Sequence, residues 1–191
     1  SYIHLCTTPP ALLWYELVAK CWNNGVRDTW MLNVGDVFQA EMLIDCFGRL
    51  AAKPDSWGAD AQDVFLHSWA KENFGEKYAE RIARHMADYY NLGFIRKPEF
   101  MCLKWTWNLP SDFRRNLIKR YRSHLAETRA IDKDLPLEKR DLWFRLAGFS
   151  CEFLAHAGII HLEGKDREYA KSVIEPLHAR WDKMDEGKWS G

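Results

Sequence analysis

Two carboxylates five positions apart, Asp36 and Glu41, are the residues whose types and spacing best suit catalysis. Hydrolysis of a glycosidic bond needs a pair of carboxyl groups: one protonates the leaving oxygen, and the other activates a water molecule or attacks the sugar. Asn33, three residues before Asp36, adds a side-chain amide that can hydrogen-bond to a substrate. Residues 33–41 therefore form the first candidate site.

Both carboxylates also have a purely structural interpretation. Asp36 and Gln39 have the spacing of a capping box for a helix predicted to start at Val37, and such a cap stabilises a helix by about 1 kcal/mol. Glu41 would lie in the first turns of that helix, where a negative charge interacts favourably with the helix dipole. The sequence leaves both interpretations open, and the two roles can coexist in one residue.

The residues that lead to this site predict a buried strand. Thr29–Asp36 joins a short apolar run to a glycine and a carboxylate, and catalytic loops usually follow the carboxyl end of such a strand. A second strand is predicted at Tyr2–Cys6 and a helix at Ala11–Asn23, ended by Gly25. We expect the two strands to be parallel and to belong to a larger α/β body, because two strands alone are not a stable sheet.

The rest of the chain predicts helices. A helix over Val37–Ala52 is followed by Lys53-Pro54-Asp55-Ser56, which marks a boundary. The longest segment beyond it, Leu137–Leu162, is apolar over much of its circumference, as expected for the central helix of a bundle. The predicted helices beyond the boundary span residues 60–74, 76–92, 112–131, 137–162 and 166–185. The predicted fold class is mainly α, with two parallel strands and their helices in residues 1–55 and a five-helix bundle in residues 56–191.

Composition and motif counts exclude several kinds of protein. The 191 residues include 27 basic and 27 acidic residues, so the chain lacks the basic excess of a general nucleic-acid or membrane-surface binder. The five cysteines lack C-x-x-C spacing and are interpreted as buried apolar residues, with a single disulfide as the alternative. One Glu175-x-x-His178 motif, containing Pro176, falls short of the two copies that a di-iron bundle needs. No metal and no other cofactor is predicted.

Two further groups could bind a sugar. Trp105 and Trp107, with Phe100, could stack on sugar faces, or they could anchor a loop over the core. Arg96 and Lys97 could meet an anionic sugar or a phosphate, or they could interact with the C-terminal dipole of the preceding helix. These residues keep open an alternative function, a non-enzymatic helical module that binds a partner or a glycan.

The sequence resembles glycoside hydrolase family 115, the xylan α-1,2-glucuronidases. Short motifs in the same order along the chain carry the resemblance. They are Thr7-Thr8-Pro9-Pro10, Gly25, the run Trp30–Asp36 with Glu41, Trp69–Gly75, Tyr89–Leu92, Arg96–Glu99, Arg140-Asp141 and Gly187–Trp189.

The resemblance implies a longer enzyme, with an active site in a (β/α)8 barrel and a bundle of about five helices after it. Residues 1–55 would then be the C-terminal part of the barrel and residues 56–191 the bundle. Such enzymes remove glucuronic acid or 4-O-methylglucuronic acid from xylan with inversion. We therefore expect glucuronoxylan or a related uronic-acid-bearing glycan as the partner, and a secreted or periplasmic parent enzyme. We expect this chain alone to be inactive, and to associate with the rest of that enzyme or as a homodimer.

The resemblance also assigns roles to the candidate residues. Asp36 matches a carboxylate at the mouth of the barrel and is predicted to be catalytic, whereas Asn33 and Glu41 are predicted to bind substrate. The family usually has lysine-proline between the two acids, and this chain has Phe38-Gln39. That difference implies altered substrate contacts in the loop, and with them a different uronic acid or glycan.

Overall fold

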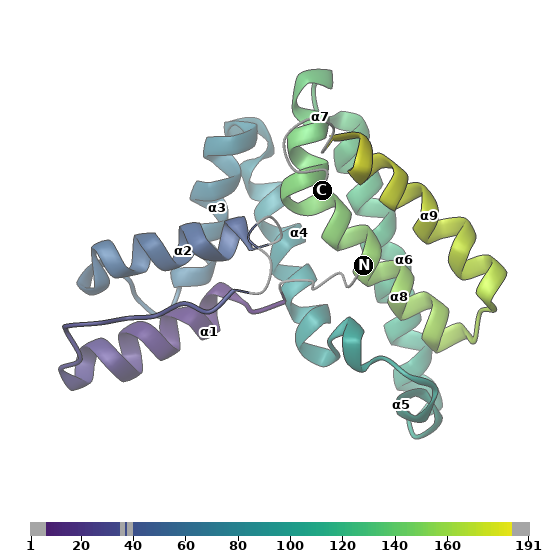
Figure 1. Ribbon diagram of the computed structural model, residues 1–191, viewed down its shortest axis with the longest axis horizontal. Coiled ribbons are helices and arrows are strands. Elements are labelled where there is room, and N and C mark those ends of the chain that lie inside the picture. The colour runs from purple at the N-terminus through teal and green to yellow at the C-terminus, as the bar shows by residue number, and fades with distance from the viewer. Residues whose placement is uncertain (1–6, 35–36, 38–39, 185–191) are drawn as a thin grey trace. The chain divides into compact units, whose positions relative to one another are not determined.

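The computed structural model describes residues 7–34, 37 and 40–184, and most of them lie in helices (Figure 1). The chain divides into two compact units, with the boundary between Ile95 and Arg96. The α-helices are α1 (Pro10–Trp14), α2 (Glu41–Ala52), α3 (Ala61–Phe74), α4 (Glu76–Ile95), α5 (Leu103–Trp107), α6 (Ser111–Asp134), α7 (Leu137–Trp143), α8 (Phe149–Glu163) and α9 (Arg167–Met184). Segments of π and 3₁₀ helix occupy Tyr15–Cys21, Trp22–Asn24, Pro54–Ser56, Pro98–Phe100 and Phe144–Gly148. None of the described helices is both long and apolar enough to cross a membrane.

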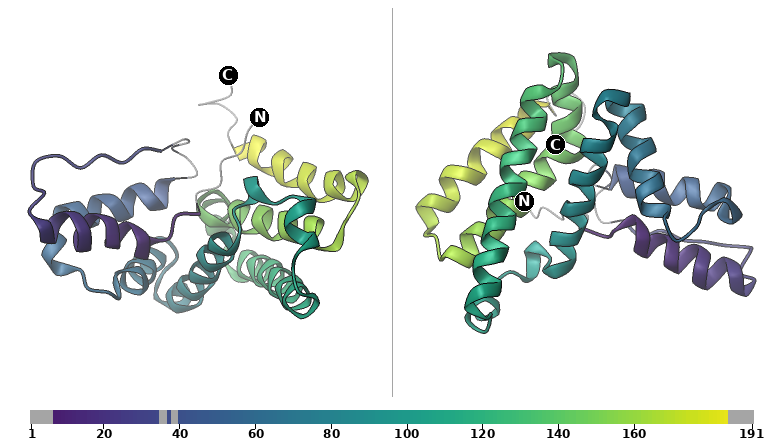
Figure 2. Two further views of the ribbon diagram at one scale, coloured as in Figure 1. Left: turned by 90° about the horizontal axis from the view of Figure 1, so that it is seen from below. Right: turned by 180° about the vertical axis from the view of Figure 1, so that it is seen from behind.

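The first unit is built around the hairpin of α3 and α4. Gly75 joins these helices with a φ of 93°, a conformation that favours glycine, and its N–H donates to the carbonyl of Lys71 at 2.9 Å. Helix α1 packs against both α2 and α3, and α1 and α2 lie side by side in Figures 1 and 2. Large side chains buried in this unit are Leu50, Phe65, Leu66, Trp69, Phe74, Ile82, Met86 and Tyr89.

The predicted parallel strands are not present in the described structure. Trp30–Val34 has no regular secondary structure, and Tyr2–Cys6 lies outside the described residues. A strand exists only when its backbone is paired in a ladder, and no backbone hydrogen bond links residues 29–34 to another described residue. The prediction of two parallel strands with helices, as part of a (β/α)8 barrel, is therefore wrong for this structure.

Helix α2 also begins later than predicted, at Glu41 instead of Val37. A turn comes first, closed by the N–H of Ala40 donating to the carbonyl of Val37 at 3.2 Å. The N–H of Ile44 then donates to Ala40 at 2.8 Å, and no side chain caps the helix. Ala40 is the residue at the N-cap, and Asp36 and Gln39, which form the predicted capping box, lie outside the described residues.

The second unit is a bundle in which α8 packs against α6 and α9. Helix α7 continues through the π turn Phe144–Gly148 into α8, close to the single long segment predicted over Leu137–Leu162. Helix α9 continues past Pro176 without a break. Large buried side chains here are Leu117, Tyr121, Trp143, Phe144, Phe149, Leu154 and Ile159.

A partly buried polar cluster links α6 to α8 in this bundle, with Glu152 and His156 buried and Arg129 exposed. The Arg129 guanidinium donates to a carboxylate oxygen of Glu152 at 3.0 Å, and its Nη2 lies 3.2 Å from Nε2 of His156. Burial, and secondarily the charge of Arg129, lowers the pKa of His156 to about 4. Burial raises the pKa of Glu152, against the opposing effect of Arg129. The imidazole is therefore neutral at pH 7 and accepts a hydrogen bond from the guanidinium.

The His156 pKa predicts an acid-sensitive bundle. Between pH 6.5 and about 4 the unfolded imidazole takes up a proton that the folded one does not, so the free energy of unfolding falls as pH decreases. Glu152 acts in the opposite direction, because its raised pKa favours protonation of the folded state. Between pH 7.5 and 4.5 the free energy of unfolding should therefore fall by about 1–3 kcal/mol less in His156→Gln than in the unmodified protein. Urea unfolding at several pH values measures this. Parallel pH profiles for the variant and the unmodified protein would contradict this.

Two glycines should respond oppositely to alanine. A Cβ at Gly158 would lie 2.5–2.6 Å from the ring of Tyr121, which is fully buried, whereas a Cβ at Gly48 would meet nothing within 4 Å. We expect Gly158→Ala to lower the free energy of unfolding by about 1–3 kcal/mol through overpacking. The control Gly48→Ala, in the exposed part of α2, should raise it by about 0.5–1 kcal/mol. Urea unfolding measures both, and a neutral Gly158→Ala would show that the α6–α8 contact is not tight.

Candidate active-site segment

The structure places two of the three predicted site residues on different kinds of backbone. Asn33 is exposed on the irregular segment before α2, and Glu41 is the half-buried first residue of α2. Asp36 lies between them, outside the described residues. Asn33 and Glu41 therefore flank the predicted catalytic carboxylate, one on an irregular segment and one on a helix.

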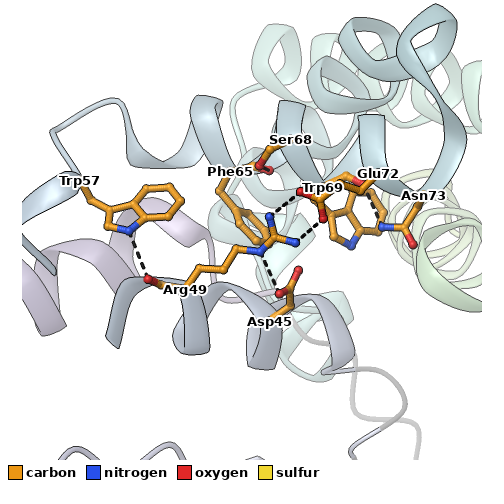
Figure 3. A network of polar contacts seen from close by, with 8 residues as sticks. All are labelled: Asp45, Arg49, Trp57, Phe65, Ser68, Trp69, Glu72 and Asn73. Atoms are coloured by element: carbon orange, nitrogen blue, oxygen red, sulfur yellow. Dashed lines mark hydrogen bonds and ion pairs between the residues drawn. The ribbon is translucent and has the colours of Figure 1, made fainter. Parts of the chain in front are cut away.

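An arginine fork fixes the helix that carries Glu41. Arg49 on α2 donates two hydrogen bonds to the carboxylate of Glu72 on α3, at 2.9 and 2.5 Å, and a third to Asp45 at 2.9 Å (Figure 3). The hydrogen bonds with Glu72 and Asp45 raise the pKa of Arg49, and the bond from Arg49 lowers the pKa of Glu72. The carbonyl of Arg49 accepts a further bond from Trp57 Nε1 at 3.3 Å. These contacts hold α2 against α3 and against the turn that follows α2.

The opposite side of α2 is apolar and buried. Met42, Leu43, Cys46 and Leu50 are each less than a tenth exposed, and the hydroxyl of Tyr90 lies 3.1 Å from the sulfur of Met42. Burial raises the pKa of the Cys46 thiol to about 12, so this thiol is protonated at neutral pH and is a poor nucleophile. The interpretation of the cysteines as buried apolar residues is confirmed for Cys46 and Cys151, but Cys21 is half-buried and Cys102 is exposed, and these four described cysteines form no disulfide.

Trp22 anchors the irregular segment at its other end. The guanidinium carbon of Arg27 lies 3.6 Å from the centre of the Trp22 ring, and Trp30 meets that ring edge-on with the ring centres 6.0 Å apart. Trp22 Nε1 donates to Asp55 at 2.5 Å. Trp22 and Asp55 also line a shallow, open depression with Lys53. The sequence alone did not reveal this cluster, since only the turn at Gly25 brings Arg27 back onto Trp22.

Burial alternates along the segment that Trp22 anchors. Trp30, Leu32 and Val34 are half-buried, whereas Asn33 is exposed and Met31 is 85% exposed. This period of two belongs to an extended chain with one covered face. Asn33 consequently shares the open face with Met31, where its amide can reach a ligand.

Removing the arginine fork should loosen α2. We expect Arg49→Met to lower the free energy of unfolding by about 1 kcal/mol or less, because the Glu72 carboxylate is more than half exposed. The control Arg84→Met breaks the more exposed Arg84–Glu80 pair on α4, and it should lower the free energy of unfolding by less. Urea unfolding gives the free energies, and hydrogen exchange should show faster exchange confined to α2.

The Arg49→Met effect should depend on pH in one direction. Glu72 has a lowered pKa in the folded state, so its contribution to stability is present above about pH 4.5 and is lost as pH falls through the folded pKa. The difference in free energy of unfolding between Arg49→Met and the unmodified protein should be smaller at pH 3 than at neutral pH. A difference that stays constant would assign the loss to the contact of the guanidinium with the Phe65 ring instead.

Comparison with known proteins identifies the family. A family model for glycosyl hydrolase family 115 matches residues 1–100. The chain is also similar to a solved structure described as a family GH115 4-O-methyl-alpha-glucuronidase, BtGH115A, with specificity for decorated arabinogalactans. That match has a TM-score of 0.83 and 23% sequence identity, and it covers 99% of this chain and 28% of that chain.

Sequence identity at this level shows a shared fold, and this chain spans little more than a quarter of the protein that it matches. No curated protein matches the chain. The family model covers more than half of the 191 residues, and it agrees with the resemblance carried by the sequence motifs. The chain belongs to glycosyl hydrolase family 115.

Proposed function

We propose that this chain forms part of a glycoside hydrolase that removes glucuronic acid or 4-O-methylglucuronic acid side groups from a polysaccharide, with inversion. The observation that carries the proposal is the family match over residues 1–100, which includes the acid-bearing segment 33–41. The family match favours this enzyme over a non-enzymatic helical module. In the proposal the enzyme is secreted or periplasmic, because a polysaccharide of this kind lies outside the cell.

The residues of the segment have separate roles in this proposal. Asp36 acts as one of the two catalytic carboxylates, by protonating the leaving oxygen or by activating water. Asn33 and Glu41 bind the sugar through hydrogen bonds. The second catalytic carboxylate comes from the rest of the enzyme, so this chain alone has no hydrolytic activity.

Two polysaccharides are candidate substrates. Glucuronoxylan follows from the resemblance in the sequence, and a decorated arabinogalactan follows from the structural neighbour with that specificity. The Phe38-Gln39 dipeptide, in place of the lysine-proline usual in the family, supports a substrate other than glucuronoxylan. A uronic acid attached to a polysaccharide is common to both.

The test uses the full-length enzyme with both polysaccharides, and measures release of the uronic acid. Asp36→Asn should lower kcat by about 10²–10⁴-fold, which is the range for loss of a general acid or base. Glu41→Gln should lower kcat/KM by about 10–100-fold and Asn33→Ala by less, as expected for lost hydrogen bonds to a bound sugar. NMR of the first product should show inverted configuration at the anomeric carbon.

Controls separate catalysis from folding. Glu16→Gln removes an exposed carboxylate that pairs with Lys20 within its own helix, and it should leave kcat and KM unchanged. Circular dichroism should show equal helix content in all variants. An Asp36→Asn enzyme with full activity on both polysaccharides would overturn the role of Asp36, and a retained configuration would overturn inversion.

A further inference from the structure

We propose that Arg96, Phe100 and Trp105 form a secondary subsite that binds the carboxylate of a uronic-acid unit. These residues belong to the second unit, and the acid-bearing segment belongs to the first. The inference rests on the proposed function, because it takes the uronic acid of that substrate as its ligand. Neither the family match nor the structural neighbour assigns a role to these residues.

The backbone around Arg96 holds the three side chains together. The 3₁₀ turn Pro98–Phe100 follows Lys97 directly, and the N–H of Phe100 donates to the carbonyl of Lys97 at 3.0 Å. The chain is then anchored by Met101, which is 5% exposed, and by Thr106, which is 3% exposed. This turn and α5 both contact α8. The subsite therefore rests on the body of the bundle.

The Arg96 guanidinium is fixed by one edge and lies near two aromatic rings. Its Nε donates to the carbonyl of Phe100 at 2.7 Å, and its Cζ lies 5.7 Å from the centre of the Phe100 ring and 5.9 Å from that of Trp105. Cation–π contacts of this kind orient the planar group. Because the guanidinium is already oriented, less side-chain entropy is lost when it binds an anion.

Arg96 differs from Arg114, Arg140 and Arg180 of its unit in what its terminal nitrogens do. Arg180 pairs with Asp132 through Nη1 and Nη2, and Arg114 and Arg140 donate through Nη2 to main-chain carbonyls. In the described part of the chain, Nη1 and Nη2 of Arg96 have neither a carboxylate nor a carbonyl partner. Two parallel N–H donors remain, and they match the two oxygens of a carboxylate.

The surroundings of Arg96 select an acidic sugar among carboxylates. Phe100 is 59% exposed, so apolar ring surface is available beside Arg96 for the C–H face of a pyranose. Residues 96–104 also carry three cations, Arg96, Lys97 and Lys104, and one carboxylate, Glu99. A uronic acid presents an apolar ring face and a carboxylate in one unit, which matches this combination.

The first test measures binding to the 191-residue chain directly. Methyl α-D-glucuronide and the neutral methyl α-D-glucoside differ only at C6, so their comparison isolates the carboxylate. We expect the glucuronide to bind with a Kd of about 1–10 mM, seen in NMR by shifts of the Arg96, Phe100 and Trp105 side-chain signals. The glucoside should bind at least 10-fold more weakly.

Variants assign the binding to the guanidinium fork. Arg96→Gln should weaken glucuronide binding by about 10-fold or more, and Arg96→Lys should recover only part of it, because lysine keeps the charge and loses the two parallel donors. Arg167→Gln removes an equal charge at the exposed start of α9 and should have no effect. Equal binding of the two glycosides, an unaffected Arg96→Gln variant or tighter binding of inorganic phosphate would each overturn the proposal.

A second test distinguishes this subsite from the proposed active site. In the full-length enzyme, Arg96→Gln should raise KM for the polysaccharide severalfold and leave kcat unchanged, whereas Asp36→Asn lowers kcat. If the enzyme releases the uronic acid and Arg96→Gln leaves KM unchanged, the subsite alone is overturned. Glucuronide binding that depends on Arg96, in an enzyme that releases no uronic acid, would overturn the proposed function alone.

Discussion

The need of every backbone N–H and C=O for a hydrogen-bond partner determines how the chain around the candidate site folds. Helices meet this need within themselves, and the described structure uses them almost throughout. The segment before α2 has no described backbone partner from residue 29 to residue 34. Its position depends instead on side chains, chiefly the contacts of Trp22 with Arg27 and Trp30. The candidate site consequently joins a segment held by side chains to a helix that satisfies its own backbone.

This arrangement has a consequence for catalysis, because catalytic groups must be held within fractions of an ångström of their working geometry. Glu41 begins a helix that is buried on one side and held on the other by the fork from Arg49 to Glu72. Asn33 belongs to the part that lacks a backbone ladder. The Arg49 fork thus holds the helix on which Glu41 lies, and Asn33 has no comparable backbone support among the described residues.

The sequence predicted what depends on neighbours along the chain, and missed what depends on distant ones. Apolar spacing placed the helices of the bundle, and Gly25 ends a helix where expected, since helix periodicity and a left-handed glycine are local features. The strand prediction for Trp30–Val34 failed because strand-forming residue types do not supply a pairing partner. The Arg49–Glu72 pair, 23 residues apart, and the clustering around Trp22 depend on tertiary contacts. The roles of Asp36, Asn33 and Glu41 stay predictions.

Two arginine–aromatic contacts in this chain show how one pair of residue types can serve folding or recognition. The guanidinium carbon of Arg27 lies 3.6 Å from the centre of the Trp22 ring, and its Nη1 donates to the carbonyls of Trp22 and Val26. Those bonds use Nη1 in closing a turn. Arg96 stands farther from its two rings, and among the described residues it donates through Nε, which leaves the Nη edge for another group. Residue type and spacing look alike at the two places, so the distinction lies in which nitrogens are already bonded. That distinction is the physical reason to assign anion binding to Arg96 and a structural role to Arg27.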